Sequence, residues 1–261
     1  MKPPYNNRPR RPMPPSDDFI IGMHPVKEAI LSGKTIDKIL IDRLETGAAT
    51  KDILALCNEN NIPVQTVPPE KLKRITHKTH QGIIALLSPV PFCNLDNLVM
   101  DAFEKGEDPL IVVLDRITDV RNMGAIARSC ECMGVHAIVI PEKNAARINH
   151  EAMKSSAGAL LHIPLCREEN LKATVLKLRN FGLIIAGVTE KGVETPYSTE
   201  LKGPLAIVMG SEEDGISDDI IRQCDHLIQI PMQGKINSLN VSVATGVVLY
   251  EVSRQRKVSD Q

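Results

Sequence analysis

The sequence predicts an α/β protein with two domains, and two observations carry this prediction. From Leu110 onward the chain contains nearly unbroken apolar runs, LIVVLD, HAIVI, LIIAGV and PLAIVMG, separated by helical stretches. Such runs indicate strands that are buried on both faces, as in a mostly parallel sheet. Before residue 89 shorter helical and strand-like pieces alternate, which is typical of a smaller α/β domain.

We divide the chain into four segments. Residues 1–18, rich in proline and arginine, are expected to form a disordered arm that is either solvated or in contact with RNA. Residues 19–88 form the smaller domain, with helices over HPVKEAILSG, TKDILALCNENN and PEKLKRI and strands over IDKILI, PVQTV and GIIALLS. Residues 89–108 are interpreted as a linker with one short helix, and residues 109–261 as the larger domain.

Composition limits the class of protein. Of the 261 residues 43% are hydrophobic, enough for a core, and no apolar run approaches the roughly 20 residues that span a bilayer. Because no signal peptide is recognisable either, we expect a soluble cytoplasmic protein with reduced, mostly buried cysteines and no structural zinc. The net charge of −1 means that any binding of nucleic acid must come from local basic patches.

A parallel sheet usually binds its ligand at the carboxyl ends of its strands. The 16 glycines include neither a dinucleotide fingerprint nor a phosphate loop, and the His-Glu-x-x-His and Gly-x-Ser-x-Gly motifs are absent. Three polar stretches that follow apolar strands are therefore the candidates for a site. They are DRITDVRNMGAIARS (115–129), GSEEDGIS (210–217) and IPMQGKINSLN (230–240).

In the first stretch, helical spacing places Arg128 on the side opposite the core. The buried stripe of this helix is predicted to consist of Ile126, Cys130 and Met133. Gly124 lies one turn before Arg128 on the same side, which would leave space for an anion or a ribose-phosphate, with Asn122 at the cap position. The alternative is an ordinary solvated arginine.

In the other two stretches, glycines and polar side chains allow two interpretations each. Gly210 and Gly215 would let the backbone approach a ligand, while Glu212 stands in an acidic run that could simply complement a helix N-terminus. Ser238 and Asn240 could both be ordinary helix caps, and the case for a cap is stronger for Ser238. Asn240, expected already inside the helix, is the less expected residue.

Together these stretches resemble a known family. NMGAIAR, VMGSEEDGIS and IPMQGKINSLNVSVATG resemble, in order and spacing, the three motifs of the SpoU (TrmH-like) RNA 2′-O-ribose methyltransferases. FIIGMHPVKEAI and HQGIIAL resemble the N-terminal RNA-recognition domain of bacterial 23S ribosomal RNA guanosine 2′-O-methyltransferases. Two places depart from the usual pattern: Val120-Arg121, where many relatives carry a proline, and the stretch EKNAARINHEAMKSS.

The resemblance implies a SPOUT-type catalytic domain with a mostly parallel sheet and a C-terminal trefoil knot, a small N-terminal ribosomal-protein L30e-like domain, a homodimer, and S-adenosylmethionine bound in the knot. By motif position, the residues that would contact this cofactor are Gly210, Ile230 and Leu239. The residues that would line the reaction site are Asn122, Arg128, Glu212, Ser238 and Asn240. The implied reaction is 2′-O-methylation of a ribose, of a guanosine in 23S ribosomal RNA. The alternatives are a tRNA 2′-O-ribose methyltransferase and a non-catalytic RNA-binding assembly factor.

Methyl transfer to a ribose hydroxyl needs an in-line approach, loss of the hydroxyl proton and stabilisation of the developing oxyanion, and it requires no metal. A guanidinium, with a pKa above about 12, is a poor proton acceptor. We therefore expect Arg128 to clamp the adjacent phosphate and to support the incipient alkoxide, while the phosphate or water takes the proton.

Two basic helix faces could hold RNA, or could simply be solvated. The first is formed by Lys71, Arg74 and Lys78 if the helix continues that far, and the second by Lys143, Arg147, His150 and Lys154. Aromatic residues make up only 3% of the chain, so contacts to phosphates and to RNA shape should outweigh base stacking.

Overall fold

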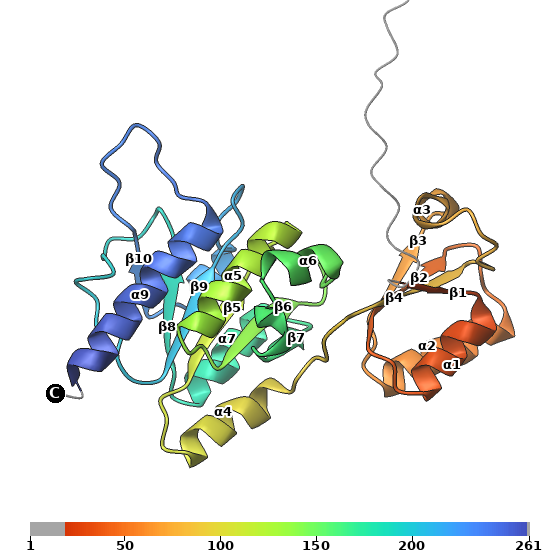
Figure 1. Ribbon diagram of the computed structural model, residues 1–261, viewed down its shortest axis with the longest axis horizontal. Helices are drawn as coiled ribbons and strands as arrows, with labels where there is room; N and C mark the ends of the chain where they lie inside the picture. Colours follow the sequence, from red (N-terminus) through yellow and green to blue (C-terminus); the bar gives the residue numbers. More distant parts are fainter. Residues whose placement is uncertain (1–18, 260–261) are drawn as a thin grey trace, which may run out of the picture. The chain divides into compact units, whose positions relative to one another are not determined.

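The structure, a computed structural model, describes residues 19–259 and divides into two units on either side of the bond between Ser88 and Pro89 (Figure 1). The segment 1–18, expected to be a disordered arm, lies outside the described residues. None of the helices within residues 19–259 is both long and apolar enough to cross a membrane.

The first unit is built on a four-stranded mixed sheet with the strand order β1-β4-β2-β3. β4 runs antiparallel to β1 and β2, and β2 runs parallel to β3. The strands are β1 (Phe19–Ile21), β2 (Ile36–Asp42), β3 (Val64–Val67) and β4 (Ile83–Leu87), and the helices are α1 (Met23–Leu31), α2 (Ala48–Glu59) and α3 (Pro69–Ile75).

Alternation along the strands gives this sheet two buried faces. Ile39 and Ile83 pack with α1 and α2, whereas their neighbours Leu40 and Ile84 pack on the other side with Leu72 of α3. Successive side chains of a strand point to opposite faces, so both sets are apolar because both faces are covered.

The expected basic face of α3 is shorter than predicted. Thr76 adopts an extended conformation (φ −151°, ψ 146°), which ends the helix at Ile75. Lys71 and Arg74 are exposed on α3, but Lys78 lies in the following loop, where its backbone N–H donates to Thr76 Oγ1 (3.2 Å). The condition on which Lys78 would join this face, a helix that continues past Ile75, is therefore not met.

The second unit contains a six-stranded sheet with the order β10-β8-β9-β5-β6-β7, and every pairing in it is parallel. This confirms the predicted parallel sheet. The strands are β5 (Leu110–Leu114), β6 (Ala137–Pro141), β7 (Leu165–Glu168), β8 (Ile184–Val188), β9 (Leu205–Met209) and β10 (His226–Ile228). The helices are α4 (Leu95–Glu104), α5 (Val120–Cys132), α6 (His150–Ser155), α7 (Leu171–Asn180), α8 (Asp218–Ile221) and α9 (Val241–Ser259).

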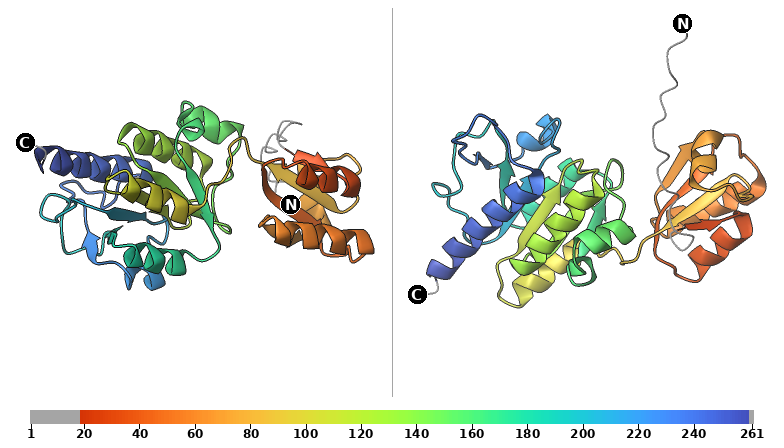
Figure 2. Two further views of the ribbon diagram at one scale, coloured as in Figure 1. Left: turned by 90° about the horizontal axis from the view of Figure 1, so that it is seen from below. Right: turned by 45° about the horizontal axis from the view of Figure 1, so that its top comes forward.

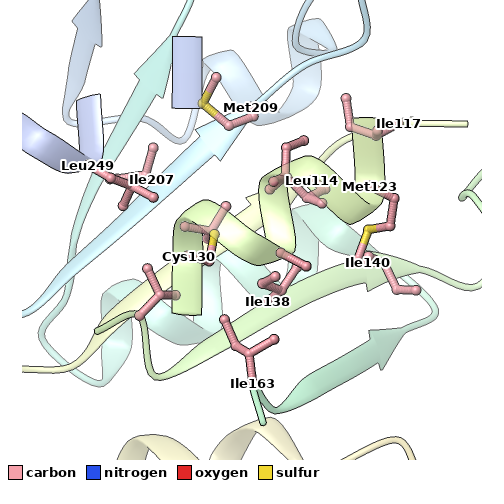
Figure 3. Close-up of a cluster of buried hydrophobic side chains, with 14 of the residues drawn as sticks. Leu114, Ile117, Met123, Cys130, Ile138, Ile140, Ile163, Ile207, Met209 and Leu249 are labelled. Atoms are coloured by element: carbon pink, nitrogen blue, oxygen red, sulfur yellow. The ribbon is translucent and has the colours of Figure 1, made fainter. Parts of the chain in front are cut away.

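Helices cover both faces of this sheet. One core layer joins the sheet to α5, α6 and α9, and the other joins it to α4, α7 and α8 (Figures 1 and 2). In β5, Val112 faces the first layer and its neighbours Ile111 and Val113 face the second, and all three are fully buried. Figure 3 shows the first layer, where Cys130 and Met123 of α5 lie over the strands. The unbroken apolar runs of the sequence follow from this two-sided burial.

The segment 89–108, expected to be a linker, is part of the second unit. Leu95 and Val99 place one face of α4 in the second core layer, and Ala102 of the same helix is buried too. Just before this helix, the Cys93 N–H donates to the Leu165 carbonyl (2.8 Å) beside β7. Proline at both ends of the segment therefore marks the ends of a packed helix and its connections.

Candidate active site

The three polar stretches meet at one edge of the parallel sheet. The first follows β5, the second follows β9, and the third follows β10 and leads into α9. Because parallel strands end at the same edge, residues more than a hundred positions apart in the chain become neighbours there.

Three predicted reaction-site residues form a hydrogen-bonded cluster. Glu212 Oε1 accepts from Asn122 Nδ2 (3.1 Å) and from Asn240 Nδ2 (2.6 Å). Asn240 Nδ2 also donates to Asn122 Oδ1 (3.0 Å). Glu212 and Asn240 are exposed and Asn122 is half-buried. The two amides therefore hold one carboxylate oriented at the surface, where a polar substrate can reach it.

Helix caps hold the two asparagines of this cluster. Asp119, and not Asn122, caps α5: its Oδ1 accepts from the backbone N–H groups of Arg121 (2.8 Å) and Asn122 (3.0 Å). Asn240 stands before the first residue of α9, and its Oδ1 accepts from the backbone N–H of Ser242 (3.0 Å). Asn240 is therefore the cap that was expected at Ser238, and the same side chain serves both the helix and the cluster.

Two of the glycines singled out in the sequence, Gly124 and Gly210, serve the protein's own packing. A Cβ atom at Gly210 would overlap the backbone of Gly215, where the loop 210–217 folds back on itself. A Cβ atom at Gly124 would overlap Ser155 Oγ of α6. The open space expected at Gly124, beside Arg128, is thus filled by α6. At Gly210 the backbone of the loop itself makes the close approach that was expected from a ligand.

Arg128 is exposed on α5, as its helical position predicts. It lies six residues beyond Asn122, about 9 Å along the helix axis, and it is outside the set of residues that line the neighbouring cavity. The guanidinium is therefore available to an external partner.

A cavity of about 630 Å³ opens beside the cluster, within the range of roughly 300–1,000 Å³ that is typical of small-molecule sites. Gly210, Ile230 and Leu239, predicted to bind the cofactor, line it, as do Glu212, Ser238 and Asn240. Its apolar wall comes from Met209, Ile216, Ile230, Leu239 and Ala244. An apolar wall beside loop backbone and charged groups suits a ligand with a flat base and a charged end, and S-adenosylmethionine fits that description.

The second expected basic face does not form. Lys143 and Arg147 lie in the loop after β6, because α6 begins only at His150. Lys143 is exposed and Arg147 is half-buried. The four residues therefore do not share one helix, and any RNA contact by Lys143 or Arg147 would involve a loop.

Two further groups at this edge were not singled out in the sequence. Glu190 and Lys191, after β8, line the cavity. Asp115 and Arg116, directly after β5, contact the loop 210–217. A charged pair directly after a buried strand, or one residue beyond its end, is the signal that could have identified both groups.

Comparison with known proteins agrees with this geometry. Residues 109–250 match the SpoU rRNA Methylase family, and residues 19–93 match the RNA 2′-O ribose methyltransferase substrate-binding family. Proteins named as TrmH family tRNA/rRNA methyltransferases are similar over nearly their whole length. The one from Staphylococcus haemolyticus is 38% identical (92% of this chain, 96% of the relative), and the one from Staphylococcus saprophyticus is 40% identical (91% and 95%).

Solved structures show the same relationship. The SpoU methyltransferase AviRb from Streptomyces viridochromogenes, in complex with AdoMet, matches with a TM-score of 0.58 at 26% identity over 92% of this chain and 90% of that one. The A. aeolicus TrmH/SpoU tRNA modifying enzyme matches with a TM-score of 0.54 at 31% identity over 64% of this chain and 86% of that one. An AdoMet-bound rRNA methyltransferase from Sinorhizobium meliloti shares the fold, with a TM-score of 0.57 at 21% identity over 90% of this chain and 86% of that one.

Both units are thus matched by families of one enzyme class, and the relatives match along the length of the chain. A cavity of suitable size lies beside the hydrogen-bonded cluster that the three sequence motifs form. The chain therefore belongs to the SpoU family, TrmH type, and is an S-adenosylmethionine-dependent RNA 2′-O-methyltransferase.

Proposed function

We propose that this enzyme methylates the ribose of a guanosine in 23S ribosomal RNA. The main support is the first unit, which matches a substrate-binding family over residues 19–93. The A. aeolicus tRNA modifying enzyme aligns with 64% of this chain, whereas the S. meliloti rRNA methyltransferase aligns with 90%. The two-unit construction therefore favours a ribosomal over a transfer RNA substrate, and the resemblance of FIIGMHPVKEAI and HQGIIAL favours guanosine.

In this proposal the cavity holds the cofactor, whose sulfonium supplies the methyl group. Gly210, Ile230 and Leu239 bind it from the cavity wall. Glu212, fixed by two amide donors, orients the ribose at the mouth of the cavity together with Ser238. Fixed hydrogen-bonding groups favour catalysis because they need no reorganisation as the reaction proceeds. This intact cluster also favours an enzyme over a non-catalytic assembly factor.

Arg128 contributes charge in this mechanism. Its exposed guanidinium binds the phosphate next to the target ribose and stabilises the developing alkoxide. Since a guanidinium is a poor base, the 2′-hydroxyl proton leaves to the phosphate or to water.

We infer a knotted chain in the second unit and an L30e-like fold in the first. The loop after β8 runs beside β10 and pairs with it through a parallel bridge between Glu194 and Ile228: the Glu194 N–H donates to the Leu227 carbonyl (3.3 Å), and the Gln229 N–H donates to the Glu194 carbonyl (2.8 Å). The chain leaves β10 beside this paired loop and continues to α9, which supports a knot. The mixed four-stranded sheet with helices on both faces supports the fold of the first unit.

We also infer a homodimer. An exposed apolar stripe runs along α9, and Val243 (51% exposed), Val247 (41%) and Tyr250 (63%) form it. A second copy of this chain is the proposed occupant, because it would bury the stripe next to the site. Val247→Asp should shift the protein toward the monomer in sedimentation experiments, and a wild-type monomer would contradict the inference.

Mapping of 2′-O-methyl groups tests the substrate directly. Ribosomal and transfer RNA from cells that lack the protein should differ from normal RNA by one unmethylated guanosine in 23S RNA. Wild-type protein should restore it, and Glu212→Gln should not. A methyl group lost from transfer RNA would instead assign the enzyme to that substrate, and unchanged methylation in both RNAs would contradict the proposed reaction.

A further inference from the structure

The carboxyl end of β5 carries a charged pair for which the mechanism above has no role. Arg116 has a φ of 61°, a left-handed conformation that residues other than glycine seldom adopt. Its side chain spans three groups: Nε donates to Asp115 Oδ1 (3.2 Å), Nη1 to Asp214 Oδ2 (3.1 Å) and Nη2 to the Gly215 carbonyl (3.0 Å). An unfavourable backbone conformation that is held by several contacts is typical of functional sites.

Asp115 completes the connection between β5 and the loop 210–217. Asp115 is buried, with 5% of the residue exposed, and its Oδ2 accepts from the Ser217 N–H (2.7 Å). The pair thus contacts the loop at Asp214, Gly215 and Ser217. All three contacts join residues about a hundred positions apart in the chain, so they depend on the pairing of β5 with β9.

The loop itself is stiff enough to pass this restraint on. Ser211 and Gly215 exchange two backbone hydrogen bonds (3.1 and 3.0 Å), and the Asp214 N–H donates to Ser211 Oγ (3.1 Å). Glu212 lies inside this closed turn, and the residues from Gly210 to Ile216 line the cavity. A shift of the turn would therefore move Glu212 and the cavity wall together.

We propose that Arg116 is a positioning residue that holds the loop 210–217 against the end of β5 and so shapes the S-adenosylmethionine cavity and places Glu212 beside Asn122 and Asn240. The role requires the planar guanidinium fork, because one side chain must reach a carboxylate and a backbone carbonyl at the same time. Lysine would keep the charge beside the buried Asp115 but could not span all three partners. The proposal rests on the cofactor cavity and does not depend on which RNA is methylated.

A matched control exists in the same unit. Arg179 Nη2 donates to the Gln223 carbonyl (2.6 Å) and to Asp225 Oδ1 (2.6 Å), and Asp225 Oδ2 accepts from the Ile185 N–H (2.8 Å). As at Arg116, a guanidinium joins a carboxylate and a backbone carbonyl, although here both bonds come from Nη2, and none of these residues lines the cavity. Arg179→Lys thus reports the general effect of replacing a hydrogen-bonded arginine away from the cavity.

The test uses the full chain and its R116K, R179K and D214N variants. Calorimetry gives the affinity for S-adenosylmethionine, and hydrogen exchange without ligand gives the opening of the loop. R116K should weaken cofactor binding by roughly tenfold, as expected for lost charge-assisted hydrogen bonds. It should also speed exchange at the amides of residues 211–217. D214N, which removes one exposed contact, should weaken binding by roughly threefold.

R179K should leave both the affinity and the exchange of residues 211–217 unchanged. The proposal is overturned if R116K binds the cofactor like wild type, or if R116K and R179K weaken binding equally. Should R116K fail to fold, D214N decides: slower exchange or unchanged affinity in D214N rejects the proposal, while weaker binding with faster exchange of the loop supports it.

Discussion

The two sheets of this protein differ in strand direction, and that difference explains where the chemistry lies. In the first unit β4 runs antiparallel to both neighbours, so strand ends are divided between the two edges of the sheet. In the second unit all pairings are parallel, so every strand ends at the same edge, where the three polar stretches meet. A parallel sheet concentrates loops into a site, whereas a mixed sheet distributes them.

The charged groups follow the same division. The first unit presents Lys71, Lys73 and Arg74 as exposed cations along α3. The second unit combines a cavity with the cluster around Glu212 and an exposed Arg128. We therefore expect the first unit to contribute affinity for RNA, and the second to contribute cofactor binding and chemistry.

The strongest test of this division of roles between the two units is to remove the first unit. A fragment of residues 89–261 should bind S-adenosylmethionine with the affinity of the full chain in calorimetry but should lose methylation of 23S RNA. The fragment must begin before α4, because Leu95 and Val99 are buried in the core of the second unit. A start at residue 108 would delete both side chains and expose the apolar core layer that they cover, at a cost of about 1.5–3 kcal/mol for each lost side chain. A folded 89–261 fragment without cofactor binding would contradict the division.

Within the second unit, Arg128→Ala should separate chemistry from cofactor binding. Loss of a charge-assisted contact made in the transition state costs about 3 kcal/mol or more. The rate of methyl transfer should therefore fall at least about a hundredfold. Cofactor affinity should be unchanged, because Arg128 lies outside the cavity lining. Arg222→Ala, an exposed arginine on the short segment after α8, is the control. Activity of R128A close to that of wild type would exclude the catalytic role.

In the first unit, the triple variant with Lys71, Arg74 and Lys78 changed to alanine should weaken RNA binding. If all three cations contact phosphates, the slope of log affinity against log salt should fall by about 0.7–0.9 per lost contact. Cofactor binding should persist. Lys34→Ala with Lys51→Ala removes two other exposed cations of the same unit and should leave the slope unchanged. If the plots of log affinity against log salt concentration are parallel for the triple variant and wild type, these cations do not form the RNA-binding surface. Lys143 is then the next candidate.

The smallest expected effect is on the pH dependence of stability, and it can be measured separately for each unit. Burial raises the pKa of Cys57, in the first unit, to about 11. Burial is also the main reason why the pKa of Cys166, in the second unit, is raised to about 12. Both thiols stay protonated in the folded protein above pH 8.5, where the unfolded chain ionises. The contribution of these thiols to the free energy of unfolding is therefore fully present below about pH 8.5. It decreases as the pH rises toward the pKa of the folded state, by up to about 1.4 kcal/mol for each thiol and each pH unit.

Urea unfolding at pH 8 and pH 10 measures this loss, and thiol labelling of Cys57 and Cys166 shows which unit opens. Cys132 is exposed and should react without unfolding. Cys57→Ala should remove the corresponding pH dependence from the first unit alone. Equal pH dependence of the first unit with and without Cys57 would rule out this thiol as its source.

The sequence by itself determined the strands, the two-unit organisation and the identity of the motif residues. Strands buried on both faces require unbroken apolar runs, and these are visible without any knowledge of what covers them. The three motifs name Asn122, Glu212 and Asn240 because their chemistry depends on residue type. The identity of these residues was therefore accessible, although their hydrogen bonds to one another were not.

Only the tertiary structure decided what each residue contacts. The segment 89–108 has the composition of a linker, yet α4 is packed because an apolar sheet face beside it must be covered. Position 124 must be glycine because Ser155 occupies the space that a Cβ atom would need, and Arg116 is held by its hydrogen bond to Asp214. Neither partner is near in sequence. Helical periodicity extends past Ile75 and starts before His150, but local hydrogen bonds end the helices there. Local patterns record that a side chain is buried or exposed, while the partner that buries it depends on chain segments brought together only by folding.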